Sequence, residues 1–248
     1  DTLPGASGYE WSKIEDELAI DHTVYTVDLL GCGRSDKSSI TYTNFVYVQM
    51  ISDFIKKIIG QKTDVIASGF SGSFVTMACH NEKELFNKIM LVNPPSLTQL
   101  KQMPNRKDRL LKAALEIPIF GTLVYHMIVS RDNINNLFIE KMYFNPFHVD
   151  NQMADAYYEA AHKGGYYTRF LYSSLAAKYI NINICHALKA LDNSIYIVEG
   201  ETEPNGKAVT DDYCASNPAI EVSVLKETKH LPHVEAPEAF LEQVKIFF

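Results

Sequence analysis

Residues 65–74 read VIASGFSGSF and contain three serines that a base could activate. A serine hydroxyl is a poor nucleophile at neutral pH, so it needs a histidine to take its proton and an acid to orient that histidine. A nucleophile of this kind stands on a sharp turn between a strand and a helix. The backbone there is strained, and the residues two positions before and after must be small.

This spacing rule separates the three serines. Ser68 has Ile66 two positions before it, and Ser73 has Val75 two positions after it. Both neighbours are too bulky for a turn in which strand and helix approach closely. Ser71 has a glycine and a serine at the same offsets, so it is the preferred nucleophile.

A second register of the same turn passes the size test. Phe70 is flanked by Ser68 and Gly72 at the required offsets. That register places an aromatic ring at the apex and leaves no nucleophile. A bulky residue in a strained conformation costs about 1–3 kcal/mol, which favours Ser71 over Phe70.

Candidate partners follow two later strand-like runs. Among the eight histidines, His230 and His233 come after such a run near the C-terminus, in KHLPHVEAPEAF. Glu201 and Glu203 follow another, in VEGETEP. The chain order is then Ser, Glu, His, which occurs in one superfamily of serine hydrolases.

The elements that must position these residues alternate along the chain. Strands are predicted at Thr23–Asp28, Asp64–Ser68, Lys88–Asn93, Ser194–Gly200 and Ile220–Leu225. Helices are predicted at Tyr9–Leu18, Tyr47–Ile59, Gly72–Asn81, Ala208–Ala215 and Pro237–Phe248. Such alternation predicts an α/β fold with a mostly parallel sheet covered by helices on both faces. Ligands bind such sheets outside the carboxyl ends of the strands, where the candidates stand.

One long stretch breaks this alternation. It contains helical patterns rich in aromatic residues and methionine, without convincing strands. We interpret it as an inserted helical cap over the strand ends. The expected division is residues 1–95 for the first part of the core, 96–187 for the cap and 188–248 for the second part of the core.

Composition excludes several classes of function. The net charge is −7 and no stripe of Lys and Arg stands out, so a nucleic-acid partner is not expected. No run reaches the roughly 18–20 apolar residues of a membrane span. The nearest, Ile117–Val129, is broken by Pro118, Gly121 and His126. It is expected to be buried or to cover a pocket, and an interfacial segment is the alternative.

The cysteines indicate a reducing compartment. Cys32, Cys79, Cys185 and Cys214 are far apart and form no C-x-x-C pair. This spacing argues against a zinc site or a disulfide framework and suits the cytoplasm. Cys32 is a rival nucleophile, but it is not on a strand-to-helix turn and lacks an obvious base.

Together these motifs resemble the α/β-hydrolase fold superfamily, in particular esterase- and lipase-like members with a helical cap. LPGASGYEW resembles the oxyanion loop, and VDLLGCGRSDK resembles the D-x-x-G-x-G-x-S-D turn. GETEP resembles the acid loop, and KHLPHVEAPEAF resembles the histidine loop. The match runs from Leu3 to Phe248 and skips only the cap.

The resemblance implies a role for each matched residue. Ser71 is the expected nucleophile, His230 the base and Glu203 the acid that orients it. The backbone N–H groups of Ala6 and Gly72 are the expected oxyanion donors, typically worth about 3–4 kcal/mol each in the transition state. No metal or organic cofactor is needed. Some relatives carry the acid after an earlier strand, and Asn93 holds that position here without a charge.

The sequence also departs from the family pattern. Pro4 replaces a histidine of the oxyanion loop, Lys229 replaces the glycine before the base, and Ser73 replaces the last glycine of G-x-S-x-G. The family also has strands before the oxyanion loop, so we expect early strands or an extension to precede residue 1.

The expected function is hydrolysis of a carboxylic ester, thioester or amide of a hydrophobic small molecule through an acyl-enzyme. A serine at the turn argues against dehalogenases and epoxide hydrolases, which need a carboxylate nucleophile. The alternative is a diverged member that binds a hydrophobic ligand without hydrolysis.

Overall fold

The structure, a computed structural model, describes residues 1–248. It divides into two units. Unit 1 contains residue 1 and residues 44–102 and 181–248, and unit 2 contains residues 2–43 and 103–180. Residues 103–180 lie within the expected insertion, while the boundaries at residues 95 and 187 stay predictions.

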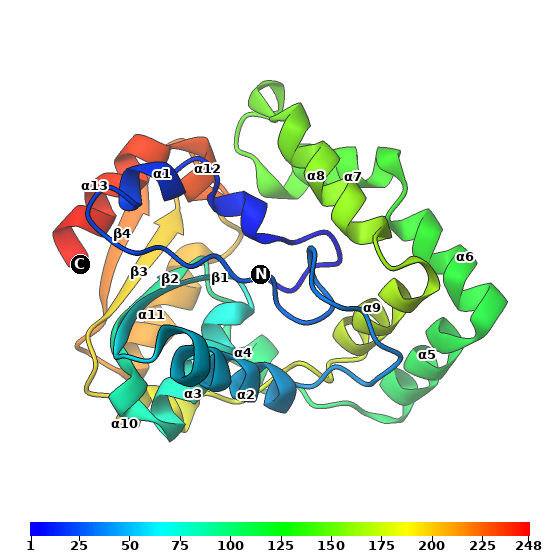
Figure 1. Ribbon diagram of the computed structural model, residues 1–248, viewed down its shortest axis with the longest axis horizontal. Helices are drawn as coiled ribbons and strands as arrows, with labels where there is room; N and C mark the ends of the chain where they lie inside the picture. Colours follow the sequence, from blue (N-terminus) through cyan, green and yellow to red (C-terminus); the bar gives the residue numbers. More distant parts are fainter. The chain divides into compact units, whose positions relative to one another are not determined.

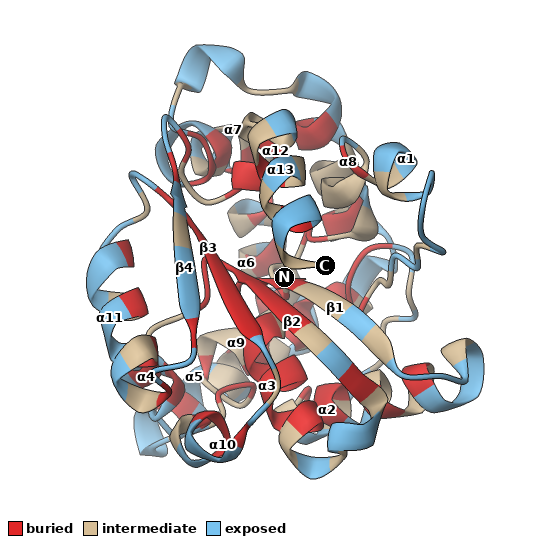
Figure 2. Ribbon diagram, turned by 90° about the vertical axis from the view of Figure 1, so that its left-hand side faces the viewer, coloured by how far each residue is buried: buried red, intermediate tan, exposed pale blue.

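Unit 1 is built on a parallel sheet of four strands in the order β1-β2-β3-β4 (Figure 2). The strands are β1 (Thr63–Ser68), β2 (Phe86–Val92), β3 (Ile195–Gly200) and β4 (Glu221–Leu225). Most of β2 and all of β3 are buried, whereas β4 forms one edge and exposes most of its residues. This pattern confirms the predicted α/β class, because only a sheet covered on both faces buries whole strands.

Helices cover both faces of this sheet. They are α2 (Asn44–Phe54) continued by the π-helical η2 (Ile55–Ile59), α3 (Ser71–Asn81), η3 (Lys83–Leu85), α4 (Leu97–Leu100), α10 (Cys185–Ala190), α11 (Gly206–Ser216), α12 (Pro232–Glu235) and α13 (Pro237–Phe247). In Figures 1 and 2, α12 and α13 lie on one side of the sheet, and α2, α3 and α10 lie on the other.

Aromatic packing holds the helices to one another and to the sheet. The ring of Tyr47 on α2 stacks on that of Phe74 on α3, with 4.9 Å between centroids, and both side chains are fully buried. Phe240 on α13 is also fully buried on the opposite side. Burial of such side chains contributes about 1.5–3 kcal/mol each, so α3 is firmly fixed beside the end of β1.

Unit 2 is helical. Its elements are η1 (Gly8–Trp11), α1 (Glu15–Leu18), α5 (Arg106–Glu116), α6 (Pro118–Ile128), α7 (Arg131–Leu137), η4 (Phe138–Met142), η5 (Pro146–His148), α8 (Asn151–His162), η6 (Gly165–Thr168) and α9 (Arg169–Ala176). Figure 1 shows α5, α6 and α9 as neighbours, and all three pack on one another. No one helix has both the length and the apolar character to cross a bilayer. Only α5 and α6 taken together, bent by 96°, meet that test.

The VDLLGCGRSDK turn has a structural role in unit 2. The carboxylate of Asp28 accepts hydrogen bonds from the backbone N–H groups of Gly8 and Arg34, both at 2.6 Å. Gly33 has φ +46° and its backbone lies against this carboxylate, so a side chain at that position would collide with it. The aspartate and the glycine of the motif therefore hold the chain around residue 8 to this turn.

One predicted strand was wrong. Thr23–Asp28 forms no strand and no other regular element. A strand needs a partner for its N–H and C=O groups, and none of the four strands of the sheet pairs with this run. Its β-rich composition was therefore not sufficient to predict a strand.

Candidate active site

The turn from β1 into α3, residues 68–71, is the sharp elbow that the sequence predicts. Its strained residue is Gly69, with φ +54°, a conformation that glycine adopts without cost. Phe70 already has helical dihedrals, with φ −60° and ψ −29°, and Ser71 begins α3. The residue that occupies the strained apex is therefore neither of the two weighed from the sequence, and it has no side chain.

The hydroxyl of Ser71 is directed to the backbone. Its Oγ donates to the carbonyl oxygen of Ser68 at 2.6 Å, and no hydrogen bond joins it to His230. Ser73 makes the same kind of bond to the carbonyl of Phe70 at 2.7 Å. Both hydroxyls thus satisfy carbonyl groups of the turn between β1 and α3, a local arrangement that serines commonly adopt.

The two expected oxyanion donors are engaged within their own turns. The N–H of Gly72 donates to the carbonyl of Gly69 at 3.2 Å, and the N–H of Ala6, in unit 2, donates to that of Leu3 at 2.9 Å. An oxyanion donor is the N–H of the residue after the elbow apex. With the apex at Gly69, the N–H at the corresponding position is that of Phe70.

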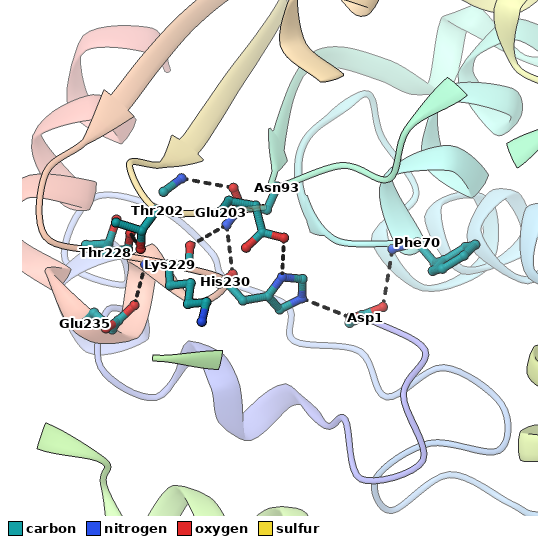
Figure 3. A network of polar contacts seen from close by, with 10 residues as sticks. Asp1, Phe70, Asn93, Thr202, Glu203, Thr228, Lys229, His230 and Glu235 are labelled. Carbon is teal, nitrogen blue, oxygen red and sulfur yellow. Dashed lines mark hydrogen bonds and ion pairs between the residues drawn. The ribbon is translucent and has the colours of Figure 1, made fainter. Parts of the chain in front are cut away.

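The structure brings the expected acid and base together. Nδ1 of His230 lies 3.2 Å from Oε1 of Glu203, and both side chains are about one-fifth exposed (Figure 3). Glu203 stands on the loop after β3, and His230 stands on the loop after β4. This proximity follows from the parallel sheet, because the carboxyl ends of neighbouring strands lie at one edge. Their catalytic roles stay predictions.

Asn93 fixes the backbone that carries His230. It follows β2, is buried, and has φ +43°, which asparagine tolerates better than most residues. Its amide nitrogen donates to the carbonyl groups of Lys229 and His230 at 2.8 and 2.9 Å, and its oxygen accepts from the N–H of Gly200 at 3.0 Å. Asn93 therefore ties the ends of β2 and β3 to the histidine loop (Figure 3).

Further bonds connect the acid loop to the histidine loop. The backbone N–H and the hydroxyl of Thr202 both donate to the carbonyl of Thr228 at 3.0 Å. The N–H of Lys229 donates to the carboxylate of Glu235 at 2.7 Å. Because backbone atoms are held on both sides of the pair, the distance between Glu203 and His230 is set by the fold.

His233 is held apart from this chemistry. It lies in α12, is completely buried and packs beside Phe240. Burial is the main cause that lowers its pKa to about 3, so the ring is neutral at physiological pH. Of the two candidate histidines, only His230 faces the elbow.

The side chain that meets His230 at the elbow is that of Asp1. Its Oδ2 lies 3.5 Å from Nε2 of His230, and its Oδ1 accepts from the N–H of Phe70 at 3.3 Å (Figure 3). The ring of Phe70 points away from the imidazole. The side chain of Asp1 is only 9% exposed, so this carboxylate is a built part of the site.

The carboxyl group of Asp1 occupies the space that a nucleophile's side chain would fill. A Cβ placed on Gly69 would come within 2.6–2.8 Å of the carboxyl atoms of Asp1. The site is therefore an imidazole between two carboxylates, one beside each ring nitrogen. Such a site can supply a carboxylate nucleophile together with an oriented base.

Sequence reasoning missed both Gly69 and Asp1. The family spacing rule was satisfied by Ser71, and backbone dihedrals are not visible in a sequence. Asp1 stands immediately before the segment that resembles the oxyanion loop. Because an oxyanion loop must approach the elbow, that position was the available signal for a carboxylate near the site.

The family comparison covers nearly the whole chain. The model of a family described as "Alpha/beta hydrolase family" matches residues 2–243. No curated protein matches the chain by sequence. The recognised resemblance to α/β-hydrolase fold proteins is thereby confirmed.

Solved structures show the same fold at low sequence identity. The epoxide hydrolase CorEH superposes with a TM-score of 0.78 at 15% identity, covering 98% of this chain and 87% of that one. A meta-cleavage product hydrolase from Pseudomonas fluorescens IP01 gives 0.77 at 18%, covering 100% and 88%. A carboxylesterase from the thaumarchaeon Nitrososphaera gargenis gives 0.70 at 16%, covering 98% and 86%. At these identities the likeness shows the fold alone.

Proposed function

Since the chain belongs to the alpha/beta hydrolase family, we propose that it is a hydrolase of a hydrophobic small molecule whose nucleophile is the carboxylate of Asp1. The observation that carries the proposal is the position of that carboxylate. It lies in the space left by Gly69 and touches both the base and the N–H that follows the elbow apex.

The first step is an attack at saturated carbon. Oδ2 of Asp1 forms a bond to the carbon, and the bond from that carbon to its leaving group breaks. The leaving group departs with the electron pair as an anion, for example a halide. Asp1 becomes a neutral alkyl ester. A carboxylate suits this step because its product is a stable covalent intermediate.

The second step is hydrolysis of that ester. Nε2 of His230 takes a proton from water, whose oxygen attacks Cγ of Asp1, and Glu203 stabilises the resulting imidazolium. The negative charge that develops on Oδ1 is met by the N–H of Phe70, which already donates to it at 3.3 Å. Collapse releases the alkoxide, which His230 protonates to the alcohol, and leaves Asp1 as a carboxylic acid that ionises to restore the carboxylate. The net consumption is one water, and the remaining proton passes to solvent.

The serine esterase mechanism expected from the sequence receives less support. It requires the hydroxyl of Ser71 to reach His230, whereas that hydroxyl donates to the carbonyl of Ser68 at 2.6 Å. The N–H of Gly72 donates to a carbonyl of its own turn. Ester hydrolysis through Ser71 is therefore the competing reaction that the experiment below is designed to exclude.

A second candidate function is binding of a hydrophobic ligand without hydrolysis. It is favoured by the fact that the carboxylate of Asp1 already contacts His230 and accepts the hydrogen bond of the Phe70 N–H. In this case Gly69 stands at the position of the nucleophile in active relatives but cannot act as one. The carboxylate of Asp1 then serves only to satisfy His230 and the N–H of Phe70.

Probes of different chemistry separate these functions. We expect release of bromide from phenethyl bromide, and no labelling of Ser71 by a fluorophosphonate. Asp1→Asn should lower bromide release by roughly 10³-fold, as expected when a member of a nucleophile–base unit is removed. Asp16→Asn on the exposed surface is the matched control and should leave the rate unchanged.

Other outcomes would reject the proposal. Fluorophosphonate labelling and hydrolysis of 4-nitrophenyl butyrate that both disappear in Ser71→Ala would establish the esterase. Saturable binding of phenethyl bromide without any turnover would establish the ligand-binding protein.

A further inference from the structure

The outer side of α6 is an unusually apolar surface. Ile119, Phe120, Leu123 and Met127 are between 54 and 78% exposed. Ile119, Leu123 and Met127 follow one another at intervals of four residues, and Phe120 stands three residues before Leu123, so the four side chains share one face of the helix. We call these four side chains the α6 face. Exposed apolar side chains that occur singly need no explanation, but a contiguous set marks an interaction site.

The inner side of the same helix is fixed within unit 2. The buried guanidinium of Arg169 donates to the carbonyl of Glu116 at 3.3 Å and to the hydroxyl of Thr122 at 3.2 Å. The hydroxyl of Tyr125 donates to the carbonyl of Ala161 at 2.7 Å. A Cβ on Gly121 would collide with the carbonyl of Leu115, so the 96° turn between α5 and α6 is tight. The α6 face is therefore held outward on a rigid support.

A cationic stretch lies on α5, the helix that immediately precedes α6. Arg106, Leu110 and Ile117 are exposed and lie on one stripe, because their spacings of four and eleven residues equal nearly whole turns. Lys107 and Arg109 are exposed beside it. The stripe begins in the charged first turn of α5 and ends at Ile117, immediately before α6.

The cationic side chains at the start of α5 are not neutralised by acidic partners. No ion pair engages Arg106, Lys107 or Arg109. The two acidic side chains of α5 are already paired. Asp108 binds Lys178 at 3.3 Å, and Glu116 binds Lys112 at 2.5 Å. The segment thus presents unbalanced positive charge although the chain as a whole carries −7.

We propose that the α6 face and the adjoining cations of α5 bind the surface of a membrane rich in anionic lipid. An amphipathic segment that combines large apolar side chains with Lys and Arg lies in the interface between headgroups and acyl chains. A second copy of the chain fits less well. In a two-fold contact the same cations of both copies would oppose one another. The proposal is independent of the reaction at the elbow.

Vesicle sedimentation tests the proposal with the whole chain. The protein should sediment with vesicles of phosphatidylcholine containing about one-third phosphatidylglycerol, and not with pure phosphatidylcholine. Raising the salt concentration should weaken binding, since surface charge is screened within a Debye length. Replacing Arg106, Lys107 and Arg109 with alanine should lower the partition coefficient by about fivefold per cation.

Variants of the α6 face test the apolar contribution. Phe120→Glu with Leu123→Glu should abolish sedimentation with the anionic vesicles. Phe45→Glu with Ile246→Glu is the matched control, because these apolar side chains are at least as exposed as Phe120 and Leu123 but lie in unit 1. Circular dichroism and thermal unfolding should show that all variants stay folded.

Three results would overturn the inference. The first is equal sedimentation with both kinds of vesicle, and the second is equal loss in both pairs of glutamate variants. The third is a concentration-dependent dimer, detected by light scattering, that Phe120→Glu with Leu123→Glu converts to a monomer without any binding to anionic vesicles. That result would assign the α6 face to a second copy.

Discussion

The carboxyl group of Asp1 fills the space into which a side chain on Gly69 would project. The two residues are 68 positions apart in the chain, yet they lie against one another at the elbow, where Gly69 has the positive φ and Asp1 carries the carboxyl group. In a serine hydrolase one residue, the serine, provides both the strained backbone and the nucleophilic side chain.

This relationship predicts how a serine mechanism could be restored. Gly69→Ser alone should give no esterase, because the new side chain would collide with Asp1 and φ +54° costs a non-glycine residue about 1 kcal/mol. Gly69→Ser combined with Asp1→Ala removes the collision and places a hydroxyl before His230. Fluorophosphonate labelling at position 69 should appear in the double variant only. Equal labelling in the single variant would show that Asp1 does not occupy the elbow.

Ser71→Ala should be nearly silent. It removes the hydrogen bond from Oγ to the carbonyl of Ser68, which contributes about 1 kcal/mol to the free energy of unfolding. Bromide release from phenethyl bromide should remain within about twofold of the unmodified chain. If the rate of bromide release fell a hundredfold or more while the fold stayed intact, Ser71 would have to take part in the reaction.

Asn93 should be required for the stability of the strand ends. Asn93→Leu removes three hydrogen bonds and leaves the carbonyls of Lys229 and His230 and the N–H of Gly200 without this partner. We expect the free energy of unfolding to fall by about 2–4 kcal/mol in denaturant titrations. Asn136→Leu, on the exposed surface of unit 2, is the control and should change it by less than about 0.5 kcal/mol.

His233 should make the protein sensitive to acid. Its pKa is about 3 in the folded chain, mainly because of burial, against an ordinary value of 6.5. Between these values the unfolded chain binds the proton more readily, so stability falls as the pH is lowered from 6.5 towards 3. The maximal slope from this group is about 1.4 kcal/mol per pH unit.

The corresponding experiment compares unfolding at neutral and acidic pH. His233→Leu should reduce the loss of stability between pH 7 and about pH 4.5. His22→Gln is the control, because His22 is exposed, and it should leave the loss unchanged. An unchanged pH dependence in His233→Leu would show that this imidazole is not held neutral.

Periodicity predicted the architecture well because burial imposes it. The strands at residues 63–68, 86–92, 195–200 and 221–225 and the last helix were all recognised from their apolar patterns. The run at residues 23–28 was wrongly predicted as a strand, because whether a β-rich run pairs depends on which strands lie beside it and not on its own composition. The proximity of Glu203 and His230 followed from strand topology combined with a resemblance in motifs.

The elbow was harder to predict for a physical reason. The rule that neighbours of the apex must be small is satisfied with Ser71, Phe70 or Gly69 at the apex. Only the backbone dihedral φ, which is positive at Gly69, shows which of the three residues occupies it. Asp1 is brought to the elbow by a tertiary contact that leaves no periodic signal in the sequence. The hydrogen bonds of Asn93 to the histidine loop and to Gly200 likewise cannot be predicted until the positions of the strand ends are known.

The role of Asp1 as the nucleophile can be tested by measuring the mass of the peptide that contains Asp1 after reaction with phenethyl bromide. In His230→Asn the attack can proceed while hydrolysis of the ester is blocked, so the intermediate should accumulate. We expect a phenethyl adduct on Asp1 that is absent in Asp1→Asn. An adduct confined to other residues, or no adduct in a variant that still binds the compound, would contradict it.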